Sequence, residues 1–141
     1  MPLSPELEQA VLKRIHEIPI TTTLGLKITV LSEGYCEVNV PRDMVYDGVS
    51  DSFHGGLLMT IADSTACYAI FTKVGARAKL TTTDMNIRFL AQCLTGATAK
   101  ATIIKFGRTL VPVAVDLFDE AGVRVAVAQV TYFVFPSDKN G

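Results

Sequence analysis

The chain has 141 residues, of which 49% are hydrophobic and 19% charged, and its formal net charge is −1. This length fits one domain, the apolar content excludes a disordered chain, and the balanced charge without a basic run argues against binding to nucleic acid or a membrane surface. Because the charged share lies below the roughly 25% of ordinary soluble domains, the composition also gives a first indication of a homo-oligomer.

The first 20 residues predict a short amphipathic helix. Ser4 suits the N-cap and Pro5 the first helical position. Apolar residues recur at helical spacing as far as Ile18, and Pro19 ends the run. Residues 26–31 and 35–40 then alternate apolar and polar side chains, as expected of a hairpin.

Residues 41–53 are interpreted as a loop, and His54-Gly55-Gly56 follows it. The next stretch, 57–74, carries apolar side chains all round a helical cylinder, which predicts a buried helix. At ~1.5 Å per residue it would be roughly 27 Å long, enough to cross a small domain.

The rest of the chain is interpreted as four strands joined by short turns, which predicts antiparallel pairing. The strands are expected at 78–90, 97–106, 109–118 and 123–135. Pro112 indicates an edge strand or a bulge. In the first of these strands, strict alternation places Thr82, Asp84, Asn86 and Arg88 on one face.

These elements predict an α+β fold in which a sheet of about six antiparallel strands curls around one long central helix. We divide the chain into an N-terminal helical segment (1–20), one domain (21–136) and a short tail (137–141). The N-terminus lacks the basic-then-apolar order of a signal peptide. The three cysteines are odd in number and show no CxxC pair, so we expect free thiols in the cytoplasm.

Asp63 is the most informative residue, because it interrupts a helix that should be buried. No cation lies one helical turn away to pair with it, and an unpaired buried carboxylate is costly. One interpretation is a general base or nucleophile in a partly dry pocket. The other is a structural aspartate that caps backbone groups or faces a subunit contact.

The His54-Gly55-Gly56 segment lies at the start of the same helix. Helix N-termini offer free N–H groups and a partial positive charge, which can polarise a carbonyl group. Ordinary turn formation, with His54 fastening the loop, is the simpler interpretation of these three residues alone.

The spacing of these groups constrains any shared function. His54 and Asp63 are nine residues apart, so a straight helix separates the carboxylate from the glycines by more than 10 Å. Either the two groups are unrelated, or two copies of the helix lie antiparallel and side by side. In the second case Gly55 of one subunit meets Asp63 of the other.

The remaining residues offer weaker candidates. Thr82 lies on a polar strand face that is more often solvated than functional, and Ser64 has no histidine at triad spacing. Cys67 is expected to be an inert packing residue. Two distant histidines do not indicate a metal site, so we expect no metal and no organic cofactor.

The segments HGGLLMTIAD (54–63) and TTTDMNIRFLAQCLTG (81–96) resemble the hotdog-fold acyl-CoA thioesterases of the phenylacetic-acid-degradation (PaaI-like) type. The resemblance covers residues 24–135. It implies a long helix wrapped by an antiparallel sheet, dimers with continuous sheets that often pair into homotetramers, and sites shared between subunits.

The resemblance also implies roles for individual residues. Asp63 corresponds to the catalytic carboxylate, and Gly55 to the backbone N–H that polarises the thioester carbonyl. His54 corresponds to the histidine beside it, and Thr82 to a hydroxyl that helps hold water. Residues expected to bind substrate are Gly48, Gly56, Ser64, Arg88 and Arg108.

One position departs from the family pattern. Many relatives carry an asparagine six residues before the histidine as a second carbonyl-binding group, and here that position is Gly48. Losing one such donor can reduce a rate by ~10²–10³. The fold prediction does not depend on this residue.

We therefore predict a thioesterase that hydrolyses an acyl-CoA, with coenzyme A present only as part of the substrate. The alternative is a non-catalytic acyl-CoA-binding protein of the same fold, acting as a sensor or scavenger. A hotdog hydratase or dehydratase is a third possibility, but its pairing of a histidine with an acid is not found.

Overall fold

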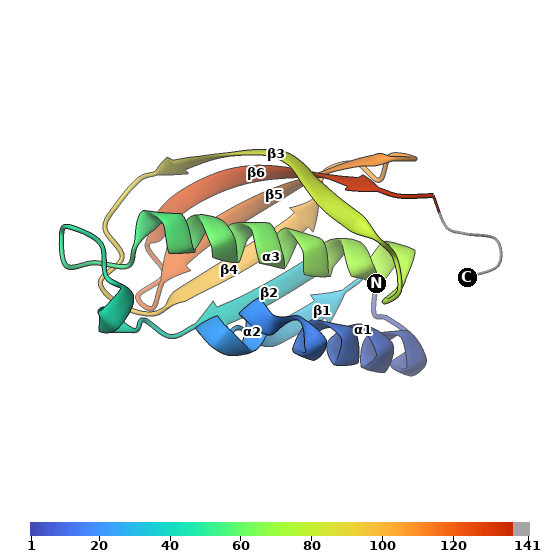
Figure 1. Cartoon of the computed structure of the whole chain (residues 1–141), viewed down its shortest axis with the longest axis horizontal. Coiled ribbons are helices and arrows are strands. Elements are labelled where there is room, and N and C mark those ends of the chain that lie inside the picture. The colour runs from blue at the N-terminus through green and yellow to red at the C-terminus, as the bar shows by residue number, and fades with distance from the viewer. Residues whose placement is uncertain (137–141) are drawn as a thin grey trace.

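The computed structural model describes residues 1–136, and its six-stranded antiparallel sheet curls around one long helix (Figure 1). The helices are α1 (Pro5–Glu17), α2 (Pro19–Leu24), the 3-10 helix η1 (Met44–Tyr46) and α3 (Gly55–Val74). The strands are β1 (Lys27–Ser32), β2 (Tyr35–Val40), β3 (Leu80–Phe89), β4 (Ala97–Ile103), β5 (Leu110–Asp119) and β6 (Arg124–Val134). Their order in the sheet is β1-β2-β4-β5-β6-β3. This arrangement confirms the predicted fold class; the predicted tail, 137–141, lies outside the described residues.

The core lies between α3 and the concave face of the sheet. Small side chains on β4, such as Ala99 and Ala101, and valines on β5, such as Val113, are fully buried there. Among the described residues, only α3 has the length and hydropathy of a membrane-crossing helix, and 56% of that stretch is buried. Burial inside the domain is the pattern of a core helix, which agrees with the sequence prediction.

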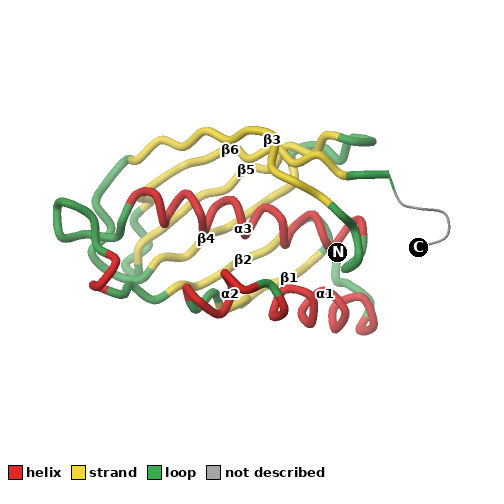
Figure 2. The backbone as a smooth tube through the Cα atoms, in the orientation of Figure 1, coloured by secondary structure: helices red, strands yellow, loops and turns green. Residues whose placement is uncertain are grey.

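The N-terminal helices pack beside α3, on the β1–β2 side (Figure 2). The Leu7 N–H donates to the predicted N-cap, Ser4 Oγ, at 3.2 Å. Pro19 does end α1, but it also begins α2, and the helical segment therefore continues to Leu24, beyond residue 20. Proline favours the first position of a helix as well as the end of the preceding one.

The side chains of β3 are distributed over its two faces differently from the prediction. The pairing with β6 shifts between Thr82 and Asp84, which is a β-bulge at Thr83. A bulge inserts one extra residue and reverses the alternation beyond it. Thr82 therefore faces α3, together with Met85, whereas Asp84 is exposed on the other face. The prediction that Thr82 and Asp84 share a face was wrong.

Pro112 was also placed wrongly, because β5 is an interior strand between β4 and β6. Pro112 lies one residue beyond the last β4–β5 pair, Ile103–Val113. The missing N–H therefore falls at the end of that ladder, where it removes no internal hydrogen bond. The loop predicted at 41–53 contains the 3-10 helix η1, which the sequence did not indicate.

Candidate active site

Asp63 lies midway along α3, half-buried, and is held by two hydroxyl groups from the sheet. Thr82 Oγ1 on β3 donates to Asp63 Oδ1 at 2.7 Å. The Tyr132 hydroxyl on β6 donates to the same oxygen at 2.8 Å and lies 2.9 Å from the Asp63 backbone carbonyl oxygen. No cation pairs with Asp63 among residues 1–136. The carboxylate is therefore oriented without being neutralised.

The two oxygens of this carboxylate differ. Oδ1 accepts both hydroxyls, whereas Oδ2 has no hydrogen-bond partner within the described part of the chain. A half-buried carboxylate with one free oxygen can accept a proton from water or attack a carbonyl carbon. The bulge at Thr83 makes this arrangement possible, because it turns Thr82 toward α3.

Tyr132 was not among the residues predicted from the sequence. It stands in the long apolar run of the last strand, and which face it occupies depends on the register between β6 and β3. Its side chain is only 6% exposed. Burial raises the pKa of Tyr132 far above its ordinary value, so the phenol stays protonated and acts as a donor.

His54 caps the N-terminus of α3 through its side chain. Its Nδ1 accepts the Gly56 N–H at 2.9 Å, so in the neutral ring the proton lies on Nε2. A Cβ atom at position 56 would lie 3.0 Å from His54 Cε1. A side chain at position 56 would crowd the imidazole in this position, and Gly56 contributes space rather than a free donor.

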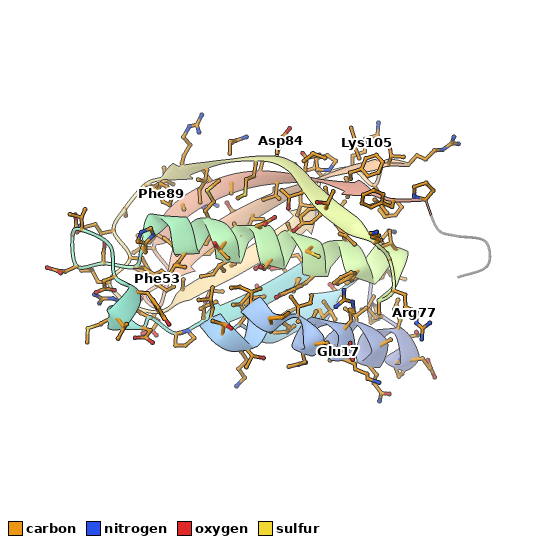
Figure 3. The ribbon with its side chains drawn as sticks, in the orientation of Figure 1. Glu17, Phe53, Arg77, Asp84, Phe89 and Lys105 are labelled. Atoms are coloured by element: carbon orange, nitrogen blue, oxygen red, sulfur yellow. The ribbon has the colours of Figure 1, made fainter. Side chains whose placement is uncertain are left out.

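Gly55 supplies the free amide at this end of the helix. Its N–H has no acceptor among the described residues. The ring of Phe89, 52% exposed at the end of β3, packs against it, with Cζ 3.2 Å from where a Cβ on Gly55 would be (Figure 3). The positive end of the α3 dipole is therefore available beside an aromatic ring.

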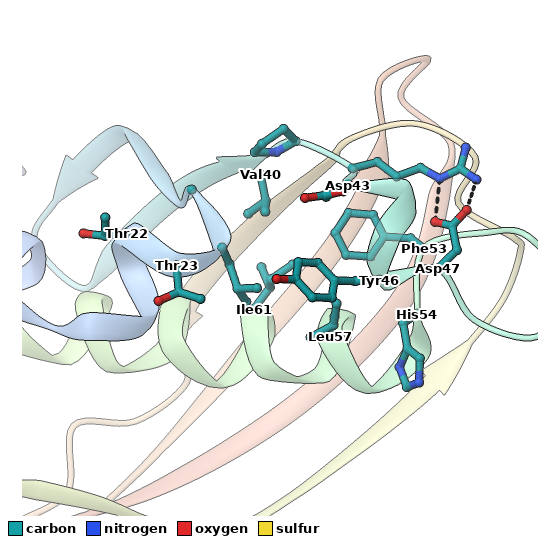
Figure 4. Close-up of a pocket in the computed structure, with 14 residues that line it drawn as sticks. Thr22, Thr23, Val40, Asp43, Tyr46, Asp47, Phe53, His54, Leu57 and Ile61 are labelled. Carbon is teal, nitrogen blue, oxygen red and sulfur yellow. Dashed lines mark hydrogen bonds and ion pairs between the residues drawn. The ribbon is translucent and has the colours of Figure 1, made fainter.

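Arg42 fastens the loop that precedes His54. Its Nε and Nη2 donate to the two carboxylate oxygens of Asp47, at 2.9 and 2.5 Å (Figure 4). The same guanidinium donates to the backbone carbonyls of Leu94 and Asp51 at 2.7 and 2.9 Å. The hydrogen bond from Arg42 holds the pKa of Asp47 below its usual range. Sequence reasoning missed this clamp, since the two residues were interpreted only as loop.

The other predicted residues lie in different surroundings. The Gly48 N–H donates to Ser52 O at 2.9 Å inside this loop, so its backbone offers no free donor in place of the family asparagine. Ser64 is half-buried, next to Asp63 on α3.

The two predicted arginines are far apart. Arg88 is exposed beside Phe89, at the Gly55 end of α3. Arg108 is exposed in the turn after β4, and that turn contacts the other end of α3 through Phe106, whose ring lies 5.4 Å from Lys73 Nζ. One chain therefore does not bring Arg88 and Arg108 together.

Gly55 and Asp63 are themselves separated along the helix. Eight residues at 1.5 Å each place them about 12 Å apart. One chain cannot bring both groups to the same carbonyl, so the predicted sharing between two subunits is still required for a joint site. No group of three potential metal ligands occurs in the part of the chain that the structure describes.

Comparisons with known proteins identify the family. Residues 9–134 match the family model described as a domain of unknown function, DUF4442. Ta0293 of Thermoplasma acidophilum, which its name describes as a candidate esterase, is 24% identical over 113 residues, covering 79% of this chain and 85% of its own.

Solved structures share the fold over nearly the whole chain. A thioesterase family protein from Silicibacter pomeroyi is 24% identical with a TM-score of 0.85, covering 93% of this chain and 99% of its own. The PaaI protein of the E. coli phenylacetic acid degradation operon is 20% identical with a TM-score of 0.86, covering 96% and 97%. The chain therefore belongs to the DUF4442 family and has the hotdog fold of PaaI-like thioesterases, which confirms the resemblance drawn from its residues.

Proposed function

We propose that this protein is an acyl-CoA thioesterase, which hydrolyses the thioester to a free acid and coenzyme A. The observation that carries the proposal is the state of Asp63, a half-buried carboxylate that Thr82 and Tyr132 orient through Oδ1. Within residues 1–136, Oδ2 has no hydrogen-bond partner and no cation pairs with the carboxylate. A purely structural aspartate needs only the bonds through Oδ1, whereas a base or nucleophile also requires a free oxygen.

The reaction divides between the two ends of the site. The thioester carbonyl oxygen accepts the Gly55 N–H at the positive end of α3, which stabilises negative charge as it develops. Asp63 Oδ2 takes a proton from a water molecule whose oxygen bonds to the carbonyl carbon. The C–S bond then breaks, and the thiolate of coenzyme A receives that proton. Thr82 and Tyr132 hold Asp63 in place throughout.

Direct attack by Asp63 is the other route for the same carboxylate. Oδ2 would bond to the carbonyl carbon, coenzyme A would leave, and water would hydrolyse the resulting anhydride. The free oxygen serves either route, and both use the Gly55 N–H in the same way. Both need only groups of the protein together with water and substrate.

The proposal includes a second copy of the chain. Two observations support it: the separation of about 12 Å between Gly55 and Asp63, and the position of β3 at the edge of the sheet, where β6 is its one partner among the described strands. Each of two symmetric sites would take its carboxylate from one protomer and its amide from the partner, as a dimer or a pair of dimers.

The test is Asp63→Asn, which keeps the shape of the side chain and removes the base. We expect the kcat/KM for an acyl-CoA, followed by thiol release, to fall by about 10²–10⁴. Asp84→Asn, an exposed aspartate close by on β3, is the matched control and should leave kcat/KM unchanged. Full activity in a folded Asp63→Asn protein would exclude the proposal.

Binding without turnover is a second candidate function, favoured by Gly48. The position lacks the family asparagine, and its own amide is bonded to Ser52 O. Calorimetry with an acyl-CoA, run beside the thiol-release assay, separates the two functions. Tight binding with no thiol released over a broad acyl-CoA panel would favour the binding protein over the enzyme.

A further inference from the structure

A cavity of about 210 Å³ lies between α2, η1 and the first turns of α3 (Figure 4). Its apolar floor consists of buried or half-buried side chains from β2, the loop before α3 and α3 itself: Val40, Phe53, Leu57 and Ile61. Its rim includes Tyr46 on η1, which is 50% exposed. A buried apolar floor beneath an open rim is the usual construction of a small-molecule pocket.

The cavity lies close to the proposed reaction centre but outside the groups assigned to it. Its wall includes His54, the residue directly before Gly55. Leu57 and Ile61 lie one turn apart on the same side of α3. Asp63, two residues beyond Ile61, is about 200° further round the helix. The cavity therefore lies beside the N-terminus of α3, with His54 in its wall, and on the opposite side of α3 from the carboxylate of its own chain.

We infer that this cavity receives the apolar acyl group, an inference that rests on the proposed thioesterase function. A carbonyl held by the Gly55 N–H of one protomer would extend its tail past His54 into the cavity of the same protomer. The partner's carboxylate would meet the carbonyl from the other side. Each chain would then supply acyl recognition for one site and the base for the other.

The size of the cavity sets the length of the acyl group. A cavity of about 210 Å³ that is open at its rim suits an acyl chain of medium length, on the order of eight carbons, better than a very short one. Longer chains would have to leave the cavity through its rim.

Charge in the cavity selects against acidic acyl groups. Arg42 and Asp47 line one end but are bonded to each other. Asp43 on the exposed rim has no ion-pair partner within residues 1–136, and its Oδ1 accepts the Val45 N–H at 3.0 Å. An acyl group ending in a second carboxylate would bring like charge against Asp43, so we expect monocarboxylic acyl groups to be preferred.

The experiment measures kcat/KM for straight-chain acyl-CoAs from two to sixteen carbons, with two variants that change the cavity in opposite directions. Leu57→Phe fills the floor, and Tyr46→Ala opens the rim. We expect the first variant to lower kcat/KM for octanoyl-CoA by about tenfold relative to butanoyl-CoA, the loss of about two buried methylenes. Tyr46→Ala should move the optimum to longer chains.

Val45→Ala is the matched control, since Val45 is 82% exposed in the same turn but does not line the cavity. It should leave the chain-length profile unchanged. If acyl-CoAs are hydrolysed but neither cavity variant changes the dependence of kcat/KM on chain length, the inference is wrong and the proposed thioesterase function still stands. Because Tyr46 lies on the surface, we expect Tyr46→Ala to fold, and it can test the inference alone if Leu57→Phe folds poorly.

Binding of S-octyl-CoA, a thioether that cannot be hydrolysed, separates this inference from the function on which it rests. If no acyl-CoA is hydrolysed, but calorimetry shows S-octyl-CoA binding more tightly than S-ethyl-CoA and Leu57→Phe abolishes the difference, the cavity assignment stands without the enzyme. Equal affinity for the two thioethers would overturn the cavity assignment.

Discussion

The partners of Asp63 are hydroxyl groups rather than a cation, and this choice matters for its chemistry. A lysine or arginine at hydrogen-bond distance would neutralise the carboxylate and weaken it as a base. Thr82 and Tyr132 instead satisfy one oxygen, fix the rotamer and leave the charge in place. Neutral donors thus allow the carboxylate to be half-buried and hydrogen-bonded without a paired cation, as the proposed reaction requires.

Tyr132→Phe tests the orienting role of the phenol. We expect kcat/KM to fall by about tenfold, because the loss of one hydrogen bond of about 1 kcal/mol loosens Asp63. Tyr68→Phe is the matched control: that tyrosine is equally buried, but its hydroxyl lies 2.7 Å from Thr21 Oγ1.

Both tyrosine variants should unfold at lower urea concentration than the wild type, and only Tyr132→Phe should lose activity. An equal loss of activity in the two variants would show that the effect comes from general destabilisation. A Tyr132→Phe protein as active as the wild type would remove this residue from the site.

Position 55 allows the amide itself to be removed. Gly55→Pro deletes the N–H at the first position of a helix, where proline is otherwise well accepted. Gly55→Ala adds a similar Cβ against the Phe89 ring but keeps the N–H. We expect kcat/KM of the proline variant to lie about 10²–10³ below that of the alanine variant. Equal rates would show that this amide does not bind the carbonyl.

At the scale of elements, hydrophobic periodicity predicted the helices and strands whose formation depends on burial alone. The helix predicted at 57–74 and all six strands follow from apolar patterns that remain valid wherever the neighbours lie. The end of the N-terminal helix was also correct, because Pro19 cannot continue it. Helix α2 was missed because the same proline was interpreted only as a stop signal.

The candidate site depends on register, which no local pattern reveals. Thr82 faces Asp63 only because of the bulge at Thr83, and strict alternation placed it on the wrong side. Tyr132 reaches the same carboxylate through its pairing with Thr82. The Arg42–Asp47 clamp is local in sequence, but its third anchor, Leu94, is 52 residues away.

The loop between β2 and α3 should respond to acid through Asp47. Because Arg42 lowers the pKa of Asp47 in the folded protein, its stabilisation is fully present above the ordinary carboxyl pKa of about 4 and is lost as the pH falls through the lowered value. In Asp47→Asn this contribution is absent at every pH.

Urea unfolding from pH 7 to pH 2.5 measures the effect. The free energies of unfolding of wild type and Asp47→Asn should differ at neutral pH, and the difference should shrink below about pH 4 and disappear as the pH falls through the lowered pKa of Asp47. A difference that stays constant over this range would show that the Asp47 charge contributes nothing to the clamp.

At the scale of the whole molecule, the proposed function makes one chain half of a catalytic unit, because α3 separates the two proposed groups along its length. The helix carries the amide donor at its end and the carboxylate two turns further on. In an isologous pair of such helices, each end can meet the middle of the other. The protein would thereby gain two equivalent sites from one helix sequence.

Subunit mixing tests this arrangement directly. Asp63→Asn and Gly55→Pro proteins, each nearly inactive, are unfolded together and refolded. Half of the dimers would then be mixed, and one of the two sites in each would be intact, so about a quarter of wild-type activity should return. Activity that stays at the level of the separate variants would place the two groups in independent sites.

The bulge in β3 has a consequence beyond the orientation of Thr82. An exposed sheet edge invites unwanted strands, and irregular backbone is one of the ways in which proteins discourage amyloid-like stacking. Here the break at Thr83 leaves a short piece before it and the six residues Asp84–Phe89 after it. Deleting Thr83 would straighten this edge and give foreign strands a longer template, so we expect that variant to aggregate more readily than the wild type.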